Sequence, residues 1–231
     1  MVSPDGVEFT SGLAAVAIIP DEEAKRLSVK TNKQASNDAV VTYTWVKDVT
    51  SSECANTTQI AATTNNYVDI TTPGWYKVTA AAVLNRETKS AVSTVCKATF
   101  EPKLPTMTYT EEASLEIPTG DTRPTFRGNG DFDLEVVVGS VVPAAYEGYA
   151  DELFSEHLSY DWKVIVSEQP ERSLGQADID SGLIKSELGK NVLTVNADGD
   201  TSRTFVCYVT NTLNGKTITS DSTNSLAFLV L

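Results

Sequence analysis

The stretch "RTFVCYVTNTLNGKT", residues 203–217, decides the fold of this chain. Its apolar and polar side chains alternate, so that Phe205, Cys207 and Val209 point to one face of an extended strand. An Asn-Gly pair follows at 214–215, and this pair is preferred in tight turns between antiparallel strands. The stretch therefore predicts a β-hairpin whose first strand buries one face.

A second stretch, "GWYKVTAAAVLNRET" at 74–88, repeats the pattern. Its residues Tyr76, Val78 and Ala80 align with the three inward residues of the first stretch. Upstream of each stretch lies an alternating segment that contains Tyr-x-Trp. These two segments are "VTYTWVKDV" (41–49) and "LSYDWKVIV" (158–166). The chain therefore contains an internal repeat of strands.

The order of these strands resembles strands C, E, F and G of an immunoglobulin-like domain, present twice. In that family a tryptophan packs against an inter-sheet disulfide, and an aromatic residue lies two positions before the second cysteine. The resemblance places Trp45 and Trp162 at the tryptophan position, and Tyr76 and Phe205 at the aromatic position. It implies an all-β chain of two tandem immunoglobulin-like β-sandwich domains, similar to modules of tailed-phage virion proteins.

The same resemblance shows how the family's disulfide is replaced. The second-cysteine position holds Val78 in the first copy and Cys207 in the second, while the first-cysteine position falls on Val29 and on an apolar residue within 131–141. Hydrophobic pairs fill this space without an oxidant. Trp75 faces the opposite way from Tyr76 and is expected to be exposed. The residues expected in the cores are Trp45, Tyr76, Val78, Trp162, Phe205 and Cys207.

Two prolines in "FEPKLPTM" (100–107) predict a short linker, because proline blocks both helix and ladder hydrogen bonding. The expected domains are 1–102 and 105–231. An insertion at 142–158 is expected between strands B and C of the second domain. Its end, "ADELFSEHL", predicts a short amphipathic helical turn with three apolar residues on one side. These are Leu153, Phe154 and Leu158.

Charge and cysteine content limit the partners and the compartment. The 231 residues contain 18 Lys and Arg against 31 Asp and Glu, a net charge of −13, which argues against nucleic-acid or anionic-membrane binding. No basic residue precedes the apolar run at 13–19, so a signal peptide is not expected. Three cysteines at irregular spacing favour free thiols in a reducing cytosol. A Cys54–Cys96 disulfide is the alternative left open.

Motifs for catalysis or metal binding are weak, and we expect no enzyme. His157 is the one histidine, and no phosphate-binding loop, dinucleotide fingerprint or zinc-protease motif occurs. The alternating oxygen ligands Asn196, Asp198 and Asp200 leave a weak possibility of calcium. Hydrogen-bonded turn residues explain this segment without a metal. No other cofactor is expected.

The insertion holds the candidate partner contacts Tyr146, Tyr149 and Phe154. Tyrosines in a loop on a rigid scaffold are typical of binding surfaces. The alternative is that the loop folds back to cover the open end of a sandwich. A second expected docking element is the edge of the N-terminal strand.

The resemblance implies a non-enzymatic structural or decoration protein of a phage virion, made in the host cytoplasm and displayed on the virion surface. Its partner would be a capsid or other virion protein, with self-association and weak binding of host-surface glycans as further expectations. The alternative is a bacterial cell-surface adhesin or a carbohydrate-associated pair of immunoglobulin-like domains. An accessory domain pair of an enzyme is the third hypothesis.

Overall fold

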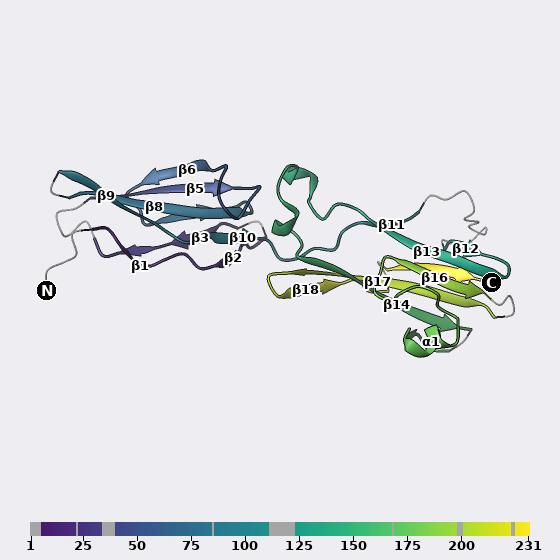
Figure 1. Ribbon diagram of the computed structural model, residues 1–231. Helices are drawn as coiled ribbons and strands as arrows, with labels where there is room; N and C mark the ends of the chain where they lie inside the picture. The colour runs from purple at the N-terminus through teal and green to yellow at the C-terminus, as the bar shows by residue number, and fades with distance from the viewer. Residues whose placement is uncertain are drawn as a thin grey trace. The chain divides into compact units, whose positions relative to one another are not determined.

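The computed structural model describes residues 6–21, 23–33, 40–84, 86–110, 123–167, 169–197, 201–222 and 225–231. The chain divides into two compact units. Unit 1 comprises Met1–Glu101 and Val142–Phe154, and unit 2 comprises Pro102–Val141 and Ser155–Leu231. Each unit is built of β-strands in packed layers (Figure 1), so the all-β prediction is confirmed.

Unit 1 contains short strands at its N-terminus and long strands in its centre. The strands are β1 (Phe9–Ser11), β2 (Val16–Ile18), β3 (Lys25–Ser28), β4 (Lys30–Thr31), β5 (Val41–Asp48), β6 (Thr58–Thr63), β7 (Tyr67–Ile70), β8 (Gly74–Leu84), β9 (Glu87–Val92) and β10 (Cys96–Thr99). A large sheet has the order β2-β10-β8-β5-β6, and β9 also pairs with β8. The pairs β1–β4 and β3–β7 form the facing layer.

Unit 2 repeats this arrangement. Its elements are β11 (Met107–Tyr109), β12 (Thr125–Phe126), β13 (Gly130–Val138), β14 (His157–Val166), β15 (Arg172–Ser173), α1 (Gln176–Asp180), β16 (Val192–Ala197), β17 (Arg203–Leu213), β18 (Lys216–Thr219) and β19 (Leu226–Val230). One sheet has the order β12-β19-β17-β14-β15 with β18 beside β17, and the other has the order β11-β13-β16. In both units the first sheet begins with a parallel strand pair, β2–β10 and β12–β19.

Strand register makes the two tryptophan positions equivalent. Trp45 on β5 lies opposite Val78 on β8, and Trp162 on β14 lies opposite Cys207 on β17. The β17–β18 turn has positive φ angles at Asn214 (51°) and Gly215 (72°), as a two-residue hairpin turn with the right twist requires. In both units the strand pairing therefore places the core tryptophan opposite the residue at the family's second-cysteine position.

The core of each unit consists of the inward residues of these strands. Side chains at the tryptophan, aromatic and cysteine positions are buried, and their exposed fractions are at most 2%. They are Trp45, Tyr76 and Val78 in unit 1, and Trp162, Phe205 and Cys207 in unit 2. On the facing layers, Val29 and the pair Leu134 and Val136 are buried at the position of the family's first cysteine. All three cysteines are free thiols.

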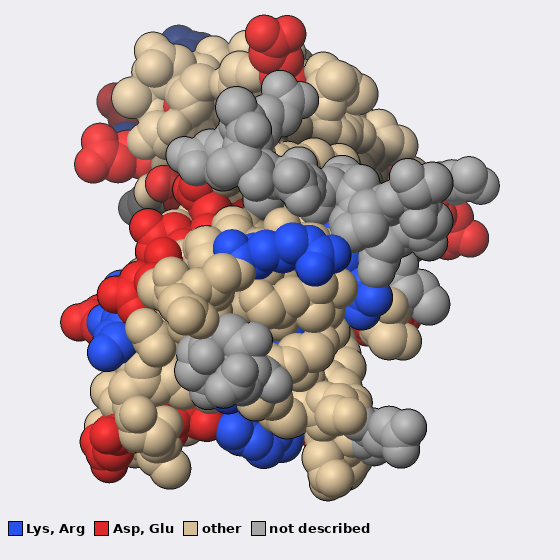
Figure 2. All heavy atoms as spheres, turned by 90° about the vertical axis from the view of Figure 1, so that its right-hand side faces the viewer, with Lys and Arg blue, Asp and Glu red and all other residues tan. Residues whose placement is uncertain are grey.

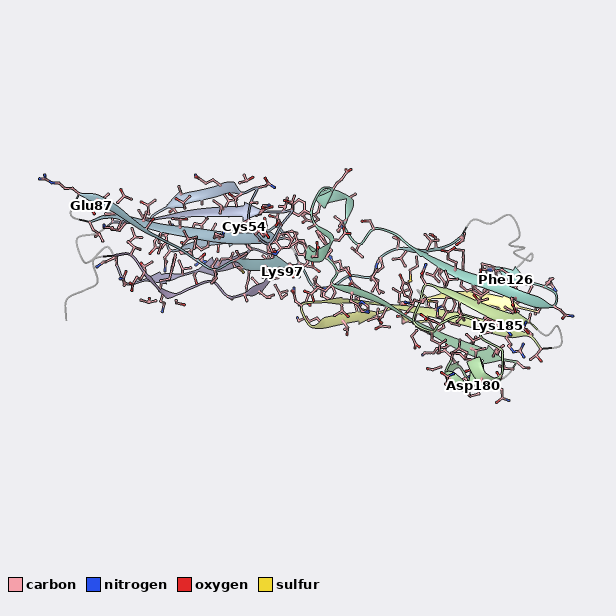
Figure 3. All side chains as sticks on the ribbon, viewed as in Figure 1. Cys54, Glu87, Lys97, Phe126, Asp180 and Lys185 are labelled. Atoms are coloured by element: carbon pink, nitrogen blue, oxygen red, sulfur yellow. The ribbon has the colours of Figure 1, made fainter. Side chains whose placement is uncertain are left out.

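Trp75 is 6% exposed, which corrects the expectation of a solvent-facing indole. It lies opposite Asp48, which is also buried, at the end of the β5–β8 pair. The chain after β5 returns to this point, because the Cys54 thiol lies 3.9 Å from the Trp75 carbonyl oxygen. Cys54 and Glu87 mark opposite ends of the large sheet of unit 1 (Figure 3). A loop therefore covers an outward position that strand alternation alone would expose.

Asp48 holds this loop in place. Its Oδ1 accepts hydrogen bonds from the Thr50 N–H (2.8 Å), the Thr50 hydroxyl (2.8 Å) and the Ser51 N–H (3.3 Å), and its Oδ2 accepts one from the Asn56 N–H (2.8 Å). Burial disfavours the charged carboxylate, but these donors outweigh it and lower the pKa of Asp48 to about 2. The ionised side chain therefore fixes the loop over Trp75.

Candidate functional site

The 142–154 segment carries the contact residues predicted from the sequence. Along the chain it lies between β13 and β14 of unit 2, but it belongs to unit 1. It contains two short 3-10 turns, η2 (Ala144–Tyr146) and η3 (Asp151–Leu153). The short helical turn predicted for its end is present as η3, with Leu153 and Phe154 buried, whereas Leu158 lies on β14 instead. The Ala150 N–H donates to the Val49 carbonyl oxygen at 2.9 Å. The segment is therefore an integral part of unit 1.

Its aromatic side chains form a cluster, the aromatic cluster, with Phe100 of unit 1. Tyr146 lies at its centre, with ring centroids 5.6 Å from Phe100, 5.3 Å from Tyr149 and 5.6 Å from Phe154. Tilted and edge-to-face rings at such distances are favourable beyond the area they bury. The adjacent Leu153 is fully buried. The cluster therefore has the packing of a small core.

Lys47 connects this cluster to the hydrogen bonds around Tyr76. Its ammonium group donates to the Tyr149 hydroxyl at 3.2 Å and to the Thr72 hydroxyl at 3.0 Å. The Tyr76 hydroxyl in turn donates to the Thr72 carbonyl oxygen at 2.7 Å, the bond of a tyrosine corner. Burial raises the pKa of Tyr76 to about 12, although its bond with Thr72 acts in the opposite direction. Tyr76 is therefore a neutral donor, and the network is structural.

These contacts decide part of the question that the sequence left open for the segment, whether it meets a partner or folds back. Phe154 is 7% exposed because its ring packs on Tyr146 and Tyr149, so for this residue the fold-back alternative holds and the partner contact does not. Tyr146 and Tyr149 are half-buried and keep an accessible edge. A partner contact through these two tyrosines stays a prediction. His157, expected in the same insertion, is the exposed first residue of β14.

Asn196, one of the positions considered for calcium, is used within a β-sheet. Asp131 accepts a hydrogen bond from the Asn196 amide at 2.6 Å, and Asp133 accepts one from the Thr194 hydroxyl at 2.7 Å, both across the β13–β16 pair. Asp198 and Asp200, named for calcium, lie outside the described residues. Within the described part of the chain, no group of three or more metal-ligating side chains occurs.

A groove of about 300 Å³ lies on unit 1. Its lining is mixed polar and apolar and includes Lys30, Tyr43 and Asn66. The Tyr43 hydroxyl shares a 3.0 Å hydrogen bond with Thr31, and the Asn66 amide donates to the Val29 carbonyl oxygen at 2.6 Å, so these groups stabilise the fold. Residues 34–39, which join two parts of the lining, lie outside the described ranges, and we assign the groove no ligand.

Sequence reasoning missed the outer face of the large sheet in unit 1. This outer face consists of the outward residues of β5, β6, β8 and β9. They are Thr42, Thr44, Val46, Gln59, Ala62, Lys77, Thr79, Ala81, Val83, Thr88, Ser90 and Val92. These accessible positions carry Lys77 and no carboxylate, in a chain with a net charge of −13, and Asp48 at the end of β5 is buried under its loop. Val83 and Val92 are 66% and 59% exposed. In the sequence, the alternation of threonine with apolar residues at 41–45 could have indicated this uncharged side of β5.

The matching face of unit 2 is charged. Asp161, on β14, occupies the position of Thr44, because both precede the core tryptophan. Lys163 pairs with Glu171 at 3.0 Å, and Glu171 also accepts a hydrogen bond from the Tyr208 hydroxyl at 2.8 Å. The Lys163 ammonium group lies 4.4 Å from the centre of the Tyr208 ring. These groups satisfy one another within unit 2.

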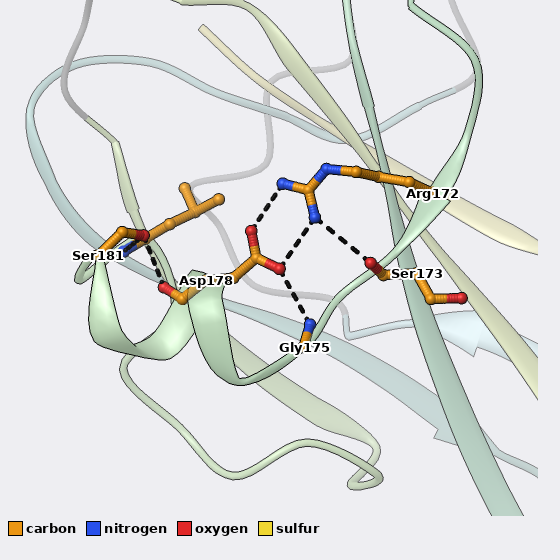
Figure 4. A network of polar contacts seen from close by, with 6 residues as sticks. Arg172, Ser173, Gly175, Asp178 and Ser181 are labelled. Atoms are coloured by element: carbon orange, nitrogen blue, oxygen red, sulfur yellow. Dashed lines mark hydrogen bonds and ion pairs between the residues drawn. The ribbon is translucent and has the colours of Figure 1, made fainter.

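Arg172 and Asp178 add a second ion pair beside this face (Figure 4). The guanidinium donates to both carboxylate oxygens, at 2.6 and 2.9 Å, and the Gly175 N–H adds a third bond of 2.9 Å. The hydrogen bond from Arg172 holds the pKa of Asp178 below its ordinary value. The pair anchors α1, so its role is structural. Figure 2 shows one face of the molecule, where small groups of basic side chains lie among acidic and uncharged residues.

Solved structures similar to this chain contain tandem immunoglobulin domains, whereas no family model and no curated protein matches it. Immunoglobulin domains 1–4 of Sidekick-1 match with a TM-score of 0.51 and 12% identity, over 100% of this chain and 50% of that one. The N-terminal four domains of Dscam1 isoform 7.44 match with a TM-score of 0.41 and 11% identity, over 98% and 51%.

A viral structure also matches. The three N-terminal domains of the bacteriophage RB49 Highly Immunogenic Outer Capsid protein match with a TM-score of 0.42 and 13% identity, over 97% of this chain and 68% of that one. The chain spans about half the length of the Sidekick-1 and Dscam1 chains. At such identities the likeness concerns the fold alone. The chain is a tandem of two immunoglobulin-like β-sandwiches. Among the described residues, no helix is long and apolar enough to cross a membrane.

Proposed function

We propose that this chain is a non-enzymatic structural protein that decorates a phage virion by docking on a capsid or other virion protein. The observation that carries the proposal is that both sandwiches are packed around free thiols and hydrophobic pairs. The family position for a disulfide holds Val78 in one unit and Cys207 in the other, both fully buried. A virion protein made in a reducing cytoplasm has to fold without disulfides.

Burial also makes the thiols of Cys96 and Cys207 unreactive. Burial raises the pKa of Cys96 to about 11 and that of Cys207 to about 12. Because the thiolate is the reactive form, both side chains behave at neutral pH as small hydrophobic residues. This chemistry fits a protein that is assembled in a reducing compartment and then exposed outside it.

The buried carboxylates support a structural role. Asp48 holds a loop, and Asp178 holds Arg172 and the start of α1. Neither lines the groove described on unit 1. The surface available to a partner includes the accessible parts of Tyr146 and Tyr149. Weak glycan binding belongs to the same proposal, without an assigned site.

The test is fractionation of infected or induced cultures of the source organism, followed by immunodetection of the native chain. The proposal expects the chain to sediment with intact particles in a density gradient, and added protein to bind chain-deficient particles at a saturable ratio. Recovery in the bacterial envelope fraction, without particle binding, would favour the adhesin instead. Recovery only among unbound proteins would contradict both functions.

A further inference from the structure

The 142–154 segment makes the chain pass between its two units more than once. Residues 1–101 form most of unit 1, and the chain then enters unit 2, returns to unit 1 for this segment, and ends in unit 2. The strands on either side of the segment in the sequence, β13 and β14, both belong to unit 2. Unit 1 therefore contains residues that the sequence places inside unit 2.

The segment contacts unit 1 at one end of its large sheet. The Ala150 N–H donates to the carbonyl oxygen of Val49, the residue after β5, at 2.9 Å. The Tyr149 hydroxyl accepts a hydrogen bond from the Lys47 ammonium group at 3.2 Å. The η3 turn lies against β10, and Phe100, which follows β10, joins the aromatic cluster. Strand register places the ends of β5 and β10 on either side of the start of β8, so the segment covers one continuous edge.

The segment has a fixed shape and buries apolar side chains. Its turns are closed by hydrogen bonds from the Tyr149 N–H to the Tyr146 carbonyl oxygen at 3.0 Å and from the Leu153 N–H to the Ala150 carbonyl oxygen at 3.1 Å. Leu153 is 0% exposed and Phe154 is 7% exposed. Burial of apolar surface is the main favourable term in folding. Removing the segment would expose apolar surface on both sides of the contact.

Unit 2 provides the contrast, because it contains none of residues 1–101. The chain after β14 covers the unit 2 core with residues of its own stretch. The Leu174 N–H donates to the Trp162 carbonyl oxygen at 3.2 Å, and Leu174 and Ile184 both belong to the unit 2 core cluster. Both residues lie between β14 and β16 in the sequence. Unit 2 is therefore complete within residues 102–231, whereas unit 1 is not complete within residues 1–101.

We propose that the 142–154 segment is a strap that unit 1 needs for its stability, so that unit 1 depends on residues from within the unit 2 sequence and unit 2 does not depend on the strap. Domains commonly fold in order from the N-terminus during synthesis. Here the first unit is completed only after residue 154 has been made. Separation of the chain at the proline linker would remove part of unit 1. This dependence holds whether or not the chain binds a virion.

Hydrogen exchange of the full chain, followed by mass spectrometry, tests the strap with two matched variants. Leu153→Ala and Leu193→Ala each truncate a leucine that is 0% exposed, the first in the strap and the second on β16. Leu153→Ala is expected to accelerate exchange at least about tenfold in β5, β8 and β10, and to leave β14, β17 and β19 unchanged. Leu193→Ala is expected to accelerate exchange in the unit 2 strands instead.

A milder variant keeps the test decisive if Leu153→Ala does not fold. Ala150 has a φ of −68°, which proline adopts, so Ala150→Pro removes the N–H that donates to Val49 and keeps the local backbone angle. It is expected to accelerate exchange in the same unit 1 strands about fivefold. Acceleration confined to residues 142–154, acceleration in unit 2 from either strap variant, or the same pattern from Leu153→Ala and Leu193→Ala would overturn the proposal.

Discussion

The two units place the same residue types at the same register positions and then complete the hydrogen bonding differently. In unit 1 the Tyr76 hydroxyl makes the corner bond to Thr72, while the buried Trp45 indole N–H finds no acceptor among the described residues. In unit 2 the Trp162 indole N–H donates to the Lys190 carbonyl oxygen at 2.8 Å, while Phe205 has no hydroxyl to donate. Packing positions are thus kept in both units, and individual polar bonds are exchangeable.

The largest expected effect tests what the units share. Trp45→Ala and Trp162→Ala each remove a fully buried indole and should lower the free energy of unfolding by about 3–5 kcal/mol. Denaturant titration followed by circular dichroism measures the loss. Because Trp75 is also buried, Trp75→Ala should be clearly destabilising too, but it lies outside the main core cluster and should cost less. If Trp75→Ala proved the most damaging of the three, the assignment of the cores would be wrong.

The next effect concerns the acid response of unit 1. Asp48→Asn should lower the stability of unit 1 by about 1–2 kcal/mol at pH 7, because hydrogen bonds to a charged acceptor are lost. The folded pKa of Asp48, about 2, is below its ordinary value of 3.8. Its contribution is therefore complete above about pH 4 and disappears as the pH falls toward 2. Thermal melts of wild type and variant should converge over this range, and a constant difference would contradict this account of Asp48.

A smaller effect tests the corner bond. Tyr76→Phe removes the hydroxyl that donates to Thr72 and should cost about 1 kcal/mol. It also makes unit 1 resemble unit 2, which has Phe205 at this position. A cost below about 0.3 kcal/mol in denaturant titration would mean that the corner bond contributes nothing measurable. Trp45→Phe is the control for the loss of a polar group. It removes an indole N–H that has no acceptor among the described residues, so it breaks no hydrogen bond.

Sequence patterns identified the repeated cores because alternation and the Tyr-x-Trp motif are local properties. They named Trp45, Val78, Trp162 and Cys207 as core residues; the structure buries all four and pairs Trp45 with Val78 and Trp162 with Cys207. The all-β fold is confirmed. Trp75 was assigned wrongly because a loop held by Asp48 returns over it, and alternation carries no information about such a loop. The burial of Phe154 was one of two alternatives that the sequence left open. Nothing local shows that the 142–154 segment packs within unit 1.

The outer face of unit 1 needed the structure for a different reason. Each of its strands is ordinary in composition, and the absence of carboxylates becomes visible only when four strands are aligned in register. The corresponding alignment in unit 2 brings Asp161, Lys163 and Glu171 together instead. The difference in charge between the two surfaces therefore follows from the cross-strand register, which the sequence only suggests.

The central claim is that both immunoglobulin-like units are held together without a disulfide, and thiol titration tests it most directly. Native protein purified without reductant should react with maleimide at the half-buried Cys54 and slowly or not at all at the buried Cys96 and Cys207. After unfolding in denaturant, still without reductant, mass spectrometry should find all three cysteines labelled. Labelling of Cys207 alone would show that Cys54 and Cys96 are bridged, and would contradict the account.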